Sequence, residues 1–274
     1  MKKDGKIWIE GIDTELTGQT LSSRELRATM GSRETIKILP DVWIIKIGGQ
    51  SIMDRGRAAL LPILDELVEA KKSGINFVIC TGGGTRARHV YSLGLDLDLP
   101  TGMLARLGAS IPVQNARMLQ MLLAKHGGIM AYPEELEKLP FFLNVGCIPI
   151  ASGMPPNEFW EKSSADGILP QNRTDAGVYL LGEFLGAKGV LYIKDEDGMY
   201  TDDPKKNPDA KFIANTTCAA LLDSGQDDLI VERVVLEYMQ QANNVKSIQI
   251  VNGLKRGNIM AALNGKSVGT TISA

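Results

Sequence analysis

Cysteines are few in this sequence, and long apolar runs are absent. Its 274 residues include only Cys80, Cys147 and Cys218, which are odd in number, widely spaced and without a CxxC pair. This usage favours reduced thiols in a cytoplasmic protein over a disulfide framework. No apolar run approaches the ~20 residues that span a bilayer, and the lysines near the N-terminus precede no apolar segment typical of a signal peptide. We therefore expect neither a membrane protein nor a secreted one.

An excess of charge of either sign is also absent. The chain has 30 Lys and Arg residues against 32 Asp and Glu residues, a formal net charge of −2. A nucleic-acid-binding protein would carry a basic excess, so we expect no nucleic-acid partner. Apolar residues make up 44% and charged residues 23%, which is typical of a soluble globular protein. The length suits one large α/β domain or two lobes.

Two common nucleotide-binding signatures are missing. No GxGxxG motif occurs, which excludes the usual dinucleotide fingerprint. Gly265-Lys266-Ser267 imitates the end of a P-loop, but Met260 occupies the position of the first P-loop glycine. Any nucleotide site in this chain must therefore be built in another way.

The pattern of apolar residues changes near Ile36. Residues 1–35 are polar and aperiodic, and Trp8-Ile9 is the pair that gives this segment something to bury. Such a segment is either disordered by itself or an arm that lies across a neighbouring subunit, and the sequence leaves both open. From Ile36 onward, short apolar runs alternate with longer amphipathic stretches.

This alternation predicts the fold class. Apolar runs indicate strands at residues 42–47, 76–80, 146–150, 189–193, 247–251 and 268–272. Amphipathic stretches indicate helices at residues 54–72, 86–95, 103–125 and 176–184, among others. Strands separated by helices imply right-handed βαβ crossovers, so we expect an α/β fold: a three-layer αβα sandwich with a mostly parallel central sheet.

Glycines follow three of the expected strands. They are Gly48-Gly49, Gly82-Gly83-Gly84 and Gly153. Glycine lets backbone N–H groups converge on an anion, and a helix that begins just afterwards adds its positive end. Ligands of open α/β sheets bind beyond the carboxyl ends of the strands. Each turn alone is equally explained by tight packing, but together they predict a site for more than one phosphate-like group.

Three charged residues near these strand ends are candidates for chemistry. Lys46 lies inside an apolar strand, where its ammonium either stabilises transferring phosphate or reaches solvent at the strand edge. Asp175 stands at a helix start, where a carboxylate is also a common N-cap. Asp197, just before Gly198, is either functional or a turn residue.

The order of these motifs resembles the amino acid kinase superfamily. The matching segments are Lys46-Ile47-Gly48-Gly49, Gly82-Gly83-Gly84, Thr174-Asp175 and Asp197-Gly198-Met199-Tyr200-Thr201-Asp202-Asp203-Pro204. The last segment is similar to the nucleotide loop of bacterial uridylate kinases. The resemblance implies an amino acid kinase-like domain over residues 36–274, with an acceptor or oxyanion lobe at about 36–165 and a nucleotide lobe at about 166–274.

Within that superfamily, further segments resemble the molybdenum storage proteins. They include Lys46-Ile47-Gly48-Gly49-Gln50-Ser51, Arg86-Ala87-Arg88-His89 and Ser152-Gly153-Met154-Pro155-Pro156. The resemblance implies a subunit that binds ATP and Mg²⁺ and hydrolyses ATP to deposit molybdate or tungstate as polynuclear oxide clusters in a hexameric cage. It also implies that residues 1–35 form an intersubunit arm, and that a second related subunit type is a possible partner.

The resemblance assigns roles residue by residue. Lys46 would neutralise the transferred phosphate, and Asp175 would orient Lys46 or a metal-bound water. The phosphate or oxyanion would be held by Gly48, Gly49, Gly82, Gly83 and Gly84. The adenine and ribose pocket would be formed by Lys194, Asp197, Tyr200, Asp203 and Pro204.

Other residues near the glycine loops carry two interpretations. Arg86, with Arg88, would clamp an oxyanion or pair with acidic residues of the next subunit. His89 and His126 are the candidate contacts of an oxide cluster. The alternatives are a structural hydrogen bond for His89 and a favourable interaction with a helix end for His126.

Two other functions stay open at this point. A uridine monophosphate (UMP) kinase is the first, although residues 104–110 and 114–115 differ from the acceptor region of uridylate kinases. A non-catalytic nucleotide-binding regulatory subunit is the second. A phosphoryl-transfer or ATPase site is common to the two enzymatic hypotheses.

Overall fold

The computed structural model describes residues 2–3, 6–7, 35–165, 167–226 and 229–274. The chain divides into two compact units, residues 1–36 and 37–274. In the first unit, β1 (Lys2–Lys3) and β2 (Lys6–Ile7) pair antiparallel. Most of the predicted arm, including Trp8-Ile9, lies outside the described residues. The second unit carries all the candidate site residues.

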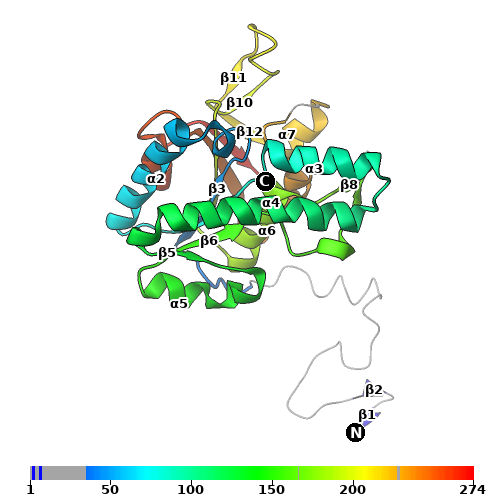
Figure 1. Cartoon of the computed structure of the whole chain (residues 1–274), viewed down its shortest axis with the longest axis horizontal. Helices are drawn as coiled ribbons and strands as arrows, with labels where there is room; N and C mark the ends of the chain where they lie inside the picture. Colours follow the sequence, from blue (N-terminus) through cyan, green and yellow to red (C-terminus); the bar gives the residue numbers. More distant parts are fainter. Residues whose placement is uncertain (1, 4–5, 8–34, 166, 227–228) are drawn as a thin grey trace. The chain divides into compact units, whose positions relative to one another are not determined.

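In the described part of this second unit, eight strands form a central sheet in the order β12-β14-β13-β9-β3-β4-β6-β5 (Figure 1). The six strands from β13 to β5 are parallel, whereas β14 is antiparallel to β13 and β12 follows the direction of β14. The bounds are β3 (Val42–Ile47), β4 (Asn76–Thr81), β5 (Gly128–Met130), β6 (Ile148–Ser152), β9 (Gly189–Lys194), β12 (Asn215–Thr217), β13 (Ser247–Asn252) and β14 (Thr270–Ser273).

Helices cover both faces of the sheet. One face packs against α2, α4 and α9, and the other against α5, α6, α7 and α8. The bounds are α2 (Arg57–Lys72), α3 (Thr85–Asp96), α4 (Thr101–Leu122), α5 (Leu139–Asn144), α6 (Thr174–Leu185), α7 (Cys218–Asp223), α8 (Arg233–Gln240) and α9 (Asn258–Leu263). The predicted α/β class, with helices on both faces of a mostly parallel sheet, is confirmed.

Short elements complete the domain. Two further antiparallel pairs join β7 (Ser163–Ser164) to β8 (Gly167–Pro170) and β10 (Met199–Tyr200) to β11 (Phe212–Ile213). The β10–β11 pair projects beyond the rest of the domain (Figure 1). The short 3₁₀-helices are η1 (Met53–Arg55), η2 (Ala124–His126), η3 (Pro133–Lys138) and η4 (Glu158–Trp160).

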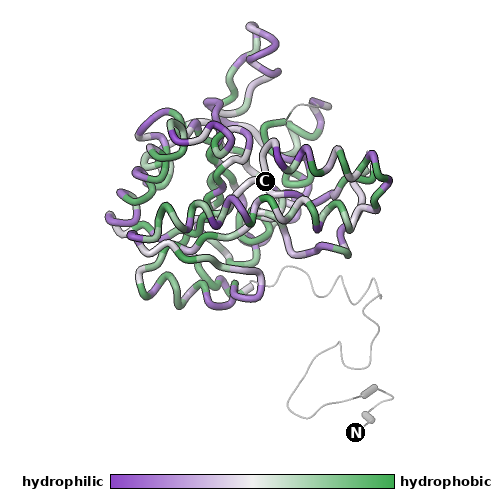
Figure 2. The backbone as a smooth tube through the Cα atoms, in the orientation of Figure 1, coloured by the Kyte–Doolittle hydropathy of each residue, from purple (hydrophilic) through white to green (hydrophobic). Residues whose placement is uncertain are grey.

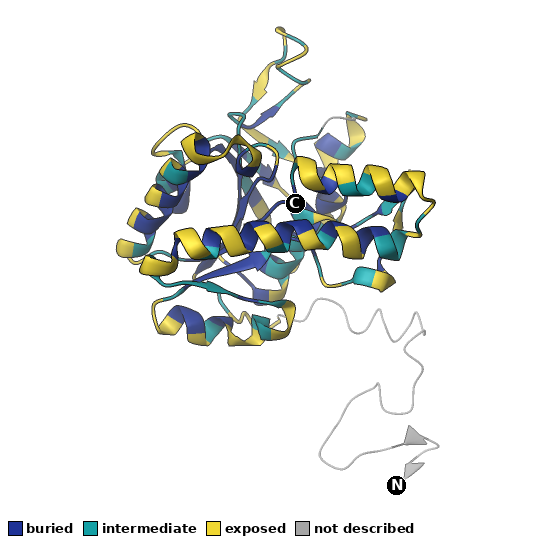
Figure 3. Ribbon diagram, in the orientation of Figure 1, coloured by how far each residue is buried: buried dark blue, intermediate teal, exposed yellow. Residues whose placement is uncertain are grey.

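Strand β3 shows why the central strands read as continuous apolar runs. Val42 and Ile44 belong to the core on one face, whereas Trp43, Ile45 and Ile47 belong to the core on the other. Because both faces are covered by helices, the positions that enter either core need apolar side chains, and Lys46 is the one polar residue of β3. Figures 2 and 3 show these strands as hydrophobic and buried.

The carboxyl ends of the parallel strands meet at one edge of the sheet. The loops that follow β3, β4 and β6 carry the predicted glycines Gly48-Gly49, Gly82–Gly84 and Gly153. Residues 195–198 follow β9 at the same edge. This arrangement places the candidate site residues of both halves of the chain around one opening.

Two absences bear on the sequence-based expectations. Among the described helices, none has both the length and the apolar character needed for a bilayer span. Cys80, Cys147 and Cys218 are free, and two of the three, Cys80 and Cys218, are buried.

Glu66 links α2 to α9 by hydrogen bonds, and its substitution tests how much these bonds contribute to stability. Its buried carboxylate accepts hydrogen bonds from the N–H groups of Gly257 (3.1 Å) and Met260 (2.7 Å) at the start of α9. We predict that Glu66→Ala lowers the free energy of unfolding by ~2 kcal/mol, because buried donors lose their acceptor. Urea unfolding measures the change.

Glu69, one turn further along α2, provides the matched control. It makes an exposed ion pair with Arg256 at 3.2 Å, and such pairs contribute ~0.5 kcal/mol or less. A Glu66→Ala variant no less stable than Glu69→Ala would show that Glu66 does not hold α9.

Candidate functional site

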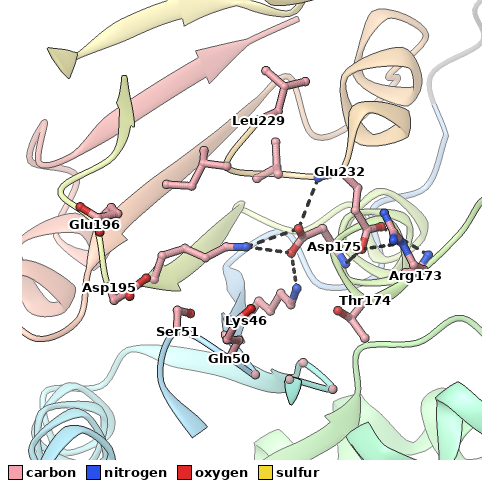
Figure 4. A pocket seen from close by; sticks show the side chains of 18 of the residues that line it. Lys46, Gln50, Ser51, Arg173, Thr174, Asp175, Asp195, Glu196, Leu229 and Glu232 are labelled. Carbon is pink, nitrogen blue, oxygen red and sulfur yellow. Dashed lines mark hydrogen bonds and ion pairs between the residues drawn. The ribbon is translucent and has the colours of Figure 1, made fainter. Parts of the chain in front are cut away.

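A cleft of about 1080 Å³ opens at the carboxyl edge of the sheet. It is lined by the glycine loops after β3 and β4, by α3, by the start of α6, by the loop after β9 and by residues 229–233. Eight basic and six acidic side chains are among its lining residues, so positive charge is in excess. Figure 4 shows how the charged residues face one another.

Two lysines share one carboxylate at the floor of this cleft. Lys46 lies near the end of β3 and forms a buried ion pair with Asp175, in the first turn of α6 (Figure 4). Lys194, at the end of the neighbouring strand β9, has its Nζ 3.4 Å from the second carboxylate oxygen of Asp175. The hydroxyl of Tyr192 donates to the backbone carbonyl of Asp175 at 2.9 Å, which fixes the start of α6 over the strands.

Lys46, Asp175 and Lys194 form a triad in which each group affects the pKa of its neighbours. Burial by itself raises the pKa of Asp175, but the ammonium groups of Lys194 and Lys46 outweigh burial and lower this pKa to about 2. Burial lowers the pKa of Lys194, and the nearby Asp175 carboxylate opposes that shift. Two ammonium groups around one carboxylate leave a net positive charge at a water-poor position, which an anionic ligand would neutralise.

Glu232, which sequence reasoning missed, holds the start of α6 in place. Its carboxylate accepts hydrogen bonds from the backbone N–H groups of Arg173 (3.3 Å), Asp175 (3.2 Å) and Ala176 (3.1 Å). Its own N–H donates to the Asp175 carboxylate at 3.3 Å. Burial and the neighbouring Asp175 raise the pKa of Glu232. No local spacing signals this role, because Glu232 and Asp175 lie 57 residues apart in the chain.

The glycine loops are both tightly packed and available for binding. A Cβ on Gly49 would lie 2.1 Å from the backbone nitrogen of Gly84, and one on Gly82 would lie 2.6 Å from that of Gly49. Yet within the described residues, the N–H groups of Gly49, Gly83 and Gly84 have no hydrogen-bond acceptor. All three residues line the cleft. Backbone donors without acceptors at a strand end are the feature expected of an anion site.

The opposite wall of the cleft carries the loop after β9. Tyr200, Asp203 and Pro204 line it together with the apolar Leu229, Ile230 and Val231. The loop is fastened across the cleft, because Asp195 accepts from Arg55 at 2.5 Å and from Lys205 at 3.2 Å. The cleft thus joins a cationic floor to a partly apolar wall, the two surfaces that a nucleotide requires.

Comparison with known proteins shows the family to which this chain belongs. The model of the amino acid kinase family matches residues 41–252. This chain belongs to the amino acid kinase family. It is 45% identical to the molybdenum storage protein subunit beta of Azotobacter vinelandii over 263 residues, which cover 96% of this chain and 97% of that protein. The predicted resemblance to these proteins is confirmed.

Uridylate kinases are more distant relatives. The enzyme of Metallosphaera sedula is 29% identical over 181 residues, which cover 65% of this chain and 72% of that protein. The crystal structure of UMP kinase from Bacillus anthracis superposes with a TM-score of 0.69 at 19% identity, covering 86% of this chain and 96% of that one. This structural likeness shows the shared amino acid kinase fold.

Two residues that the sequence predicts to bind ligand point away from the cleft. The Arg86 guanidinium donates to Gln114 at 3.1 Å and to Asn115 on α4, and Arg86 does not line the cleft. The Asp197 carboxylate accepts from Lys255 at 2.7 Å and from Asn252 at 3.0 Å, also outside the cleft lining. Both side chains hold the loops that border the cleft.

The two histidines are not brought together either. His89 is exposed on α3, and neither it nor His126 lines the cleft. His126 lies in η2, just before β5, and therefore at the amino edge of the parallel strands. In the described parts of the chain, no cluster of three or more His, Cys, Asp or Glu residues could hold a metal ion.

The pKa of Asp175 predicts how stability depends on pH. A folded-state pKa of about 2, below the ordinary value of 3.8, means that the ionised carboxylate stabilises the fold above about pH 4. This contribution is lost as the pH falls from about 4 towards 2. We predict that Asp175→Asn lowers the free energy of unfolding at pH 7 by ~3 kcal/mol, because two ammonium groups lose their counter-charge. The variant should also lose less further stability between pH 4 and pH 2 than the natural protein.

Urea unfolding at several pH values measures both effects. Asp65→Asn, at an exposed position on α2, removes one carboxylate without removing a buried partner and serves as the control. Parallel stability curves for Asp175→Asn and the natural protein would contradict the assignment.

Proposed function

We propose that this amino acid kinase is a molybdate or tungstate storage subunit. It would bind ATP with Mg²⁺ and hydrolyse ATP to deposit the oxyanion as polynuclear oxide clusters in an oligomeric cage. The observation that carries the proposal is the 45% identity to a molybdenum storage protein subunit, which extends over 96% of this chain. The similarity therefore includes both the glycine loops and the loop after β9.

The cleft geometry supports an ATPase site at the Lys46–Asp175–Lys194 triad. The two ammonium groups would neutralise phosphate oxygens as charge develops in the transition state. Asp175 would keep both ammonium groups charged and in position. With a pKa of about 2 it stays ionised at neutral pH, so it would orient a water molecule rather than carry its proton.

Backbone and loop residues would hold the rest of the nucleotide. The N–H groups of Gly49, Gly83 and Gly84 would bind phosphate oxygens. Those of the predicted Gly48 and Gly82 already donate to the carbonyls of Ile193 (3.1 Å) and Ile47 (3.0 Å), so these two glycines would act by letting the loops pack closely. Tyr200 and Pro204 would line the base, and Asp203 the ribose. Arg86 and Asp197 would act by holding the neighbouring loops, given their bonds to Asn115 and to Lys255.

The described residues fit a Mg²⁺ ion that arrives with the nucleotide. They offer no metal cluster of their own, and protein-bound Mg²⁺ commonly keeps several waters and takes one or two carboxylates beside substrate phosphates. Asp175 and Asp195, which line the cleft, are the carboxylates that would hold it. When bound, the ion would neutralise charge on the transferring phosphate.

Assembly with other subunits is part of the proposal. The relative is by name one subunit of a storage protein, and a hexamer with a second related subunit would fit residues 1–35 as an arm. Large apolar side chains that would suit an interface are exposed, among them Trp160 (85%) and Met121 (70%). His89 and His126 would be this chain's contributions to cluster binding. The protein would act in the cytoplasm.

One assay separates this function from its alternatives. ADP release from ATP and Mg²⁺ is measured alone and with molybdate, tungstate or UMP, and the metal content is determined after growth with molybdate. We predict stimulation by molybdate or tungstate and retained metal. Dependence on UMP would instead identify a UMP kinase, a function favoured by the uridylate kinase relatives. ATP binding without turnover would identify a regulatory subunit.

Lys46 is the residue on which the ATPase assignment depends. We predict that Lys46→Ala slows ADP release ~10²-fold or more, because a preorganised cation at a transferring phosphate contributes ~3 kcal/mol to transition-state stabilisation. Lys72→Ala, at an exposed position near the end of α2, should keep the rate of the natural protein. A well-folded Lys46→Ala protein with an unchanged rate would exclude Lys46 from catalysis.

A further inference from the structure

The end of the cleft formed by α3 and α4 differs in character from the nucleotide wall. We define this acceptor end by its lining residues Arg88 and Tyr91 on α3, Gly108 and Pro112 on α4, and Arg173 before α6. Helices α3 and α4 pack along one another at this end (Figure 1). The acceptor end therefore lies between two rigid helices rather than between loops.

Tyr91 fills the space that Gly108 leaves open on α4. A Cβ on Gly108 would lie 2.2 Å from the Tyr91 hydroxyl oxygen and 2.4 Å from the adjoining ring carbon, Cζ. The phenol ring therefore rests directly against the α4 backbone. The ring occupies the space over Gly108, and a ligand at the acceptor end is left with the space beside it.

Hydrogen-bond donors without acceptors surround this reduced space. Within the described residues, the Arg88 guanidinium has no carboxylate partner and the Tyr91 hydroxyl has no hydrogen bond. Burial raises the pKa of Tyr91 to about 12, so this hydroxyl remains a donor at neutral pH. The Arg173 guanidinium, by contrast, forms an ion pair with Glu232 at 3.8 Å, so Arg88 and Tyr91 are the donors that this end leaves for a ligand. Donors in excess of acceptors favour a compact anion.

We propose that Tyr91, seated on Gly108, restricts the acceptor end to a small tetrahedral oxyanion and excludes nucleoside monophosphates. Arg88 and the Tyr91 hydroxyl are the groups that bind the oxyanion. The inference rests on the proposed function, because it names the groups that select the oxyanion beside the same ATP site.

Four substitutions separate size from charge. Gly108→Ala pushes the ring into the cleft and should raise the half-saturating molybdate concentration for ADP release at least tenfold. Arg88→Gln should raise it by a similar factor through loss of the cation. Tyr91→Phe keeps the ring and removes the donor, so it should weaken molybdate stimulation and still reject UMP. Tyr91→Ala removes the ring and should bind UMP at least tenfold more tightly than the natural protein in calorimetry.

Arg117→Gln is the matched control, because Arg117 lies on α4 away from the cleft, and its guanidinium donates to the hydroxyl of Tyr132, just before η3. It removes one cation from the same helix pair and should leave the molybdate response unchanged. Thermal unfolding of each variant identifies any that fail to fold. If Tyr91→Ala does not fold, Gly108→Ala still tests the size argument, because it moves the ring without removing it.

Two kinds of failure are distinguishable. If molybdate and tungstate stimulate nothing in the natural protein, the proposed function fails, and UMP calorimetry on Tyr91→Ala still tests the size restriction by itself. If the natural protein responds to molybdate but also binds UMP, or if Gly108→Ala and Arg88→Gln respond like Arg117→Gln, the inference is overturned while the storage function stands.

Discussion

The carboxylate of Asp175 is the interaction on which the rest of the site depends. It joins Lys46 on β3, Lys194 on β9 and the backbone of Glu232 before α8. Neither lysine can remain buried as an ammonium without a counter-charge. Because α6 brings Asp175 to the two strands, the packing of α6 is what keeps both lysines charged at the floor of the cleft. The same carboxylate leaves one positive charge unbalanced, and that charge defines what the cleft can bind.

Acidic side chains elsewhere fix the loops and helix ends around this floor in a similar way. Glu66 caps α9, Glu183 accepts from the N–H groups of residues 243–245, and Asp54 accepts from Thr85 at the start of α3. Each spans a long separation in sequence and satisfies backbone donors that would otherwise be orphaned. The protein itself satisfies these donors, whereas the N–H groups of Gly49, Gly83 and Gly84 have no acceptor among the described residues.

The sequence predicts the strands and glycine loops of this site better than it predicts the contacts of individual side chains. Apolar runs locate the central strands, and the glycines after them locate the cleft, because both follow from burial and backbone sterics. The edge strands β5 and β12 are too short, at three residues each, for any periodic pattern. Glu232 carries no signal because its partner is distant in sequence. Arg86 and Arg88 show what sequence cannot predict on a helix. Residues two apart point in directions about 200° apart around the helix axis, and only the structure shows that Arg88 lines the cleft.

The two ends of the cleft are linked through a single turn of helix. Arg173 lines the acceptor end and Asp175 the phosphate end, and both have their backbone N–H groups bound by the Glu232 carboxylate. In the proposed function, the start of α6, which Glu232 holds, would set the spacing between an oxyanion near Arg173 and a phosphate near Asp175. Such a site would hold two anions at a fixed distance, and the choice of ligand at the acceptor end would depend on local features such as the Tyr91 ring. This separation would allow the acceptor end to change without a change at the phosphate end.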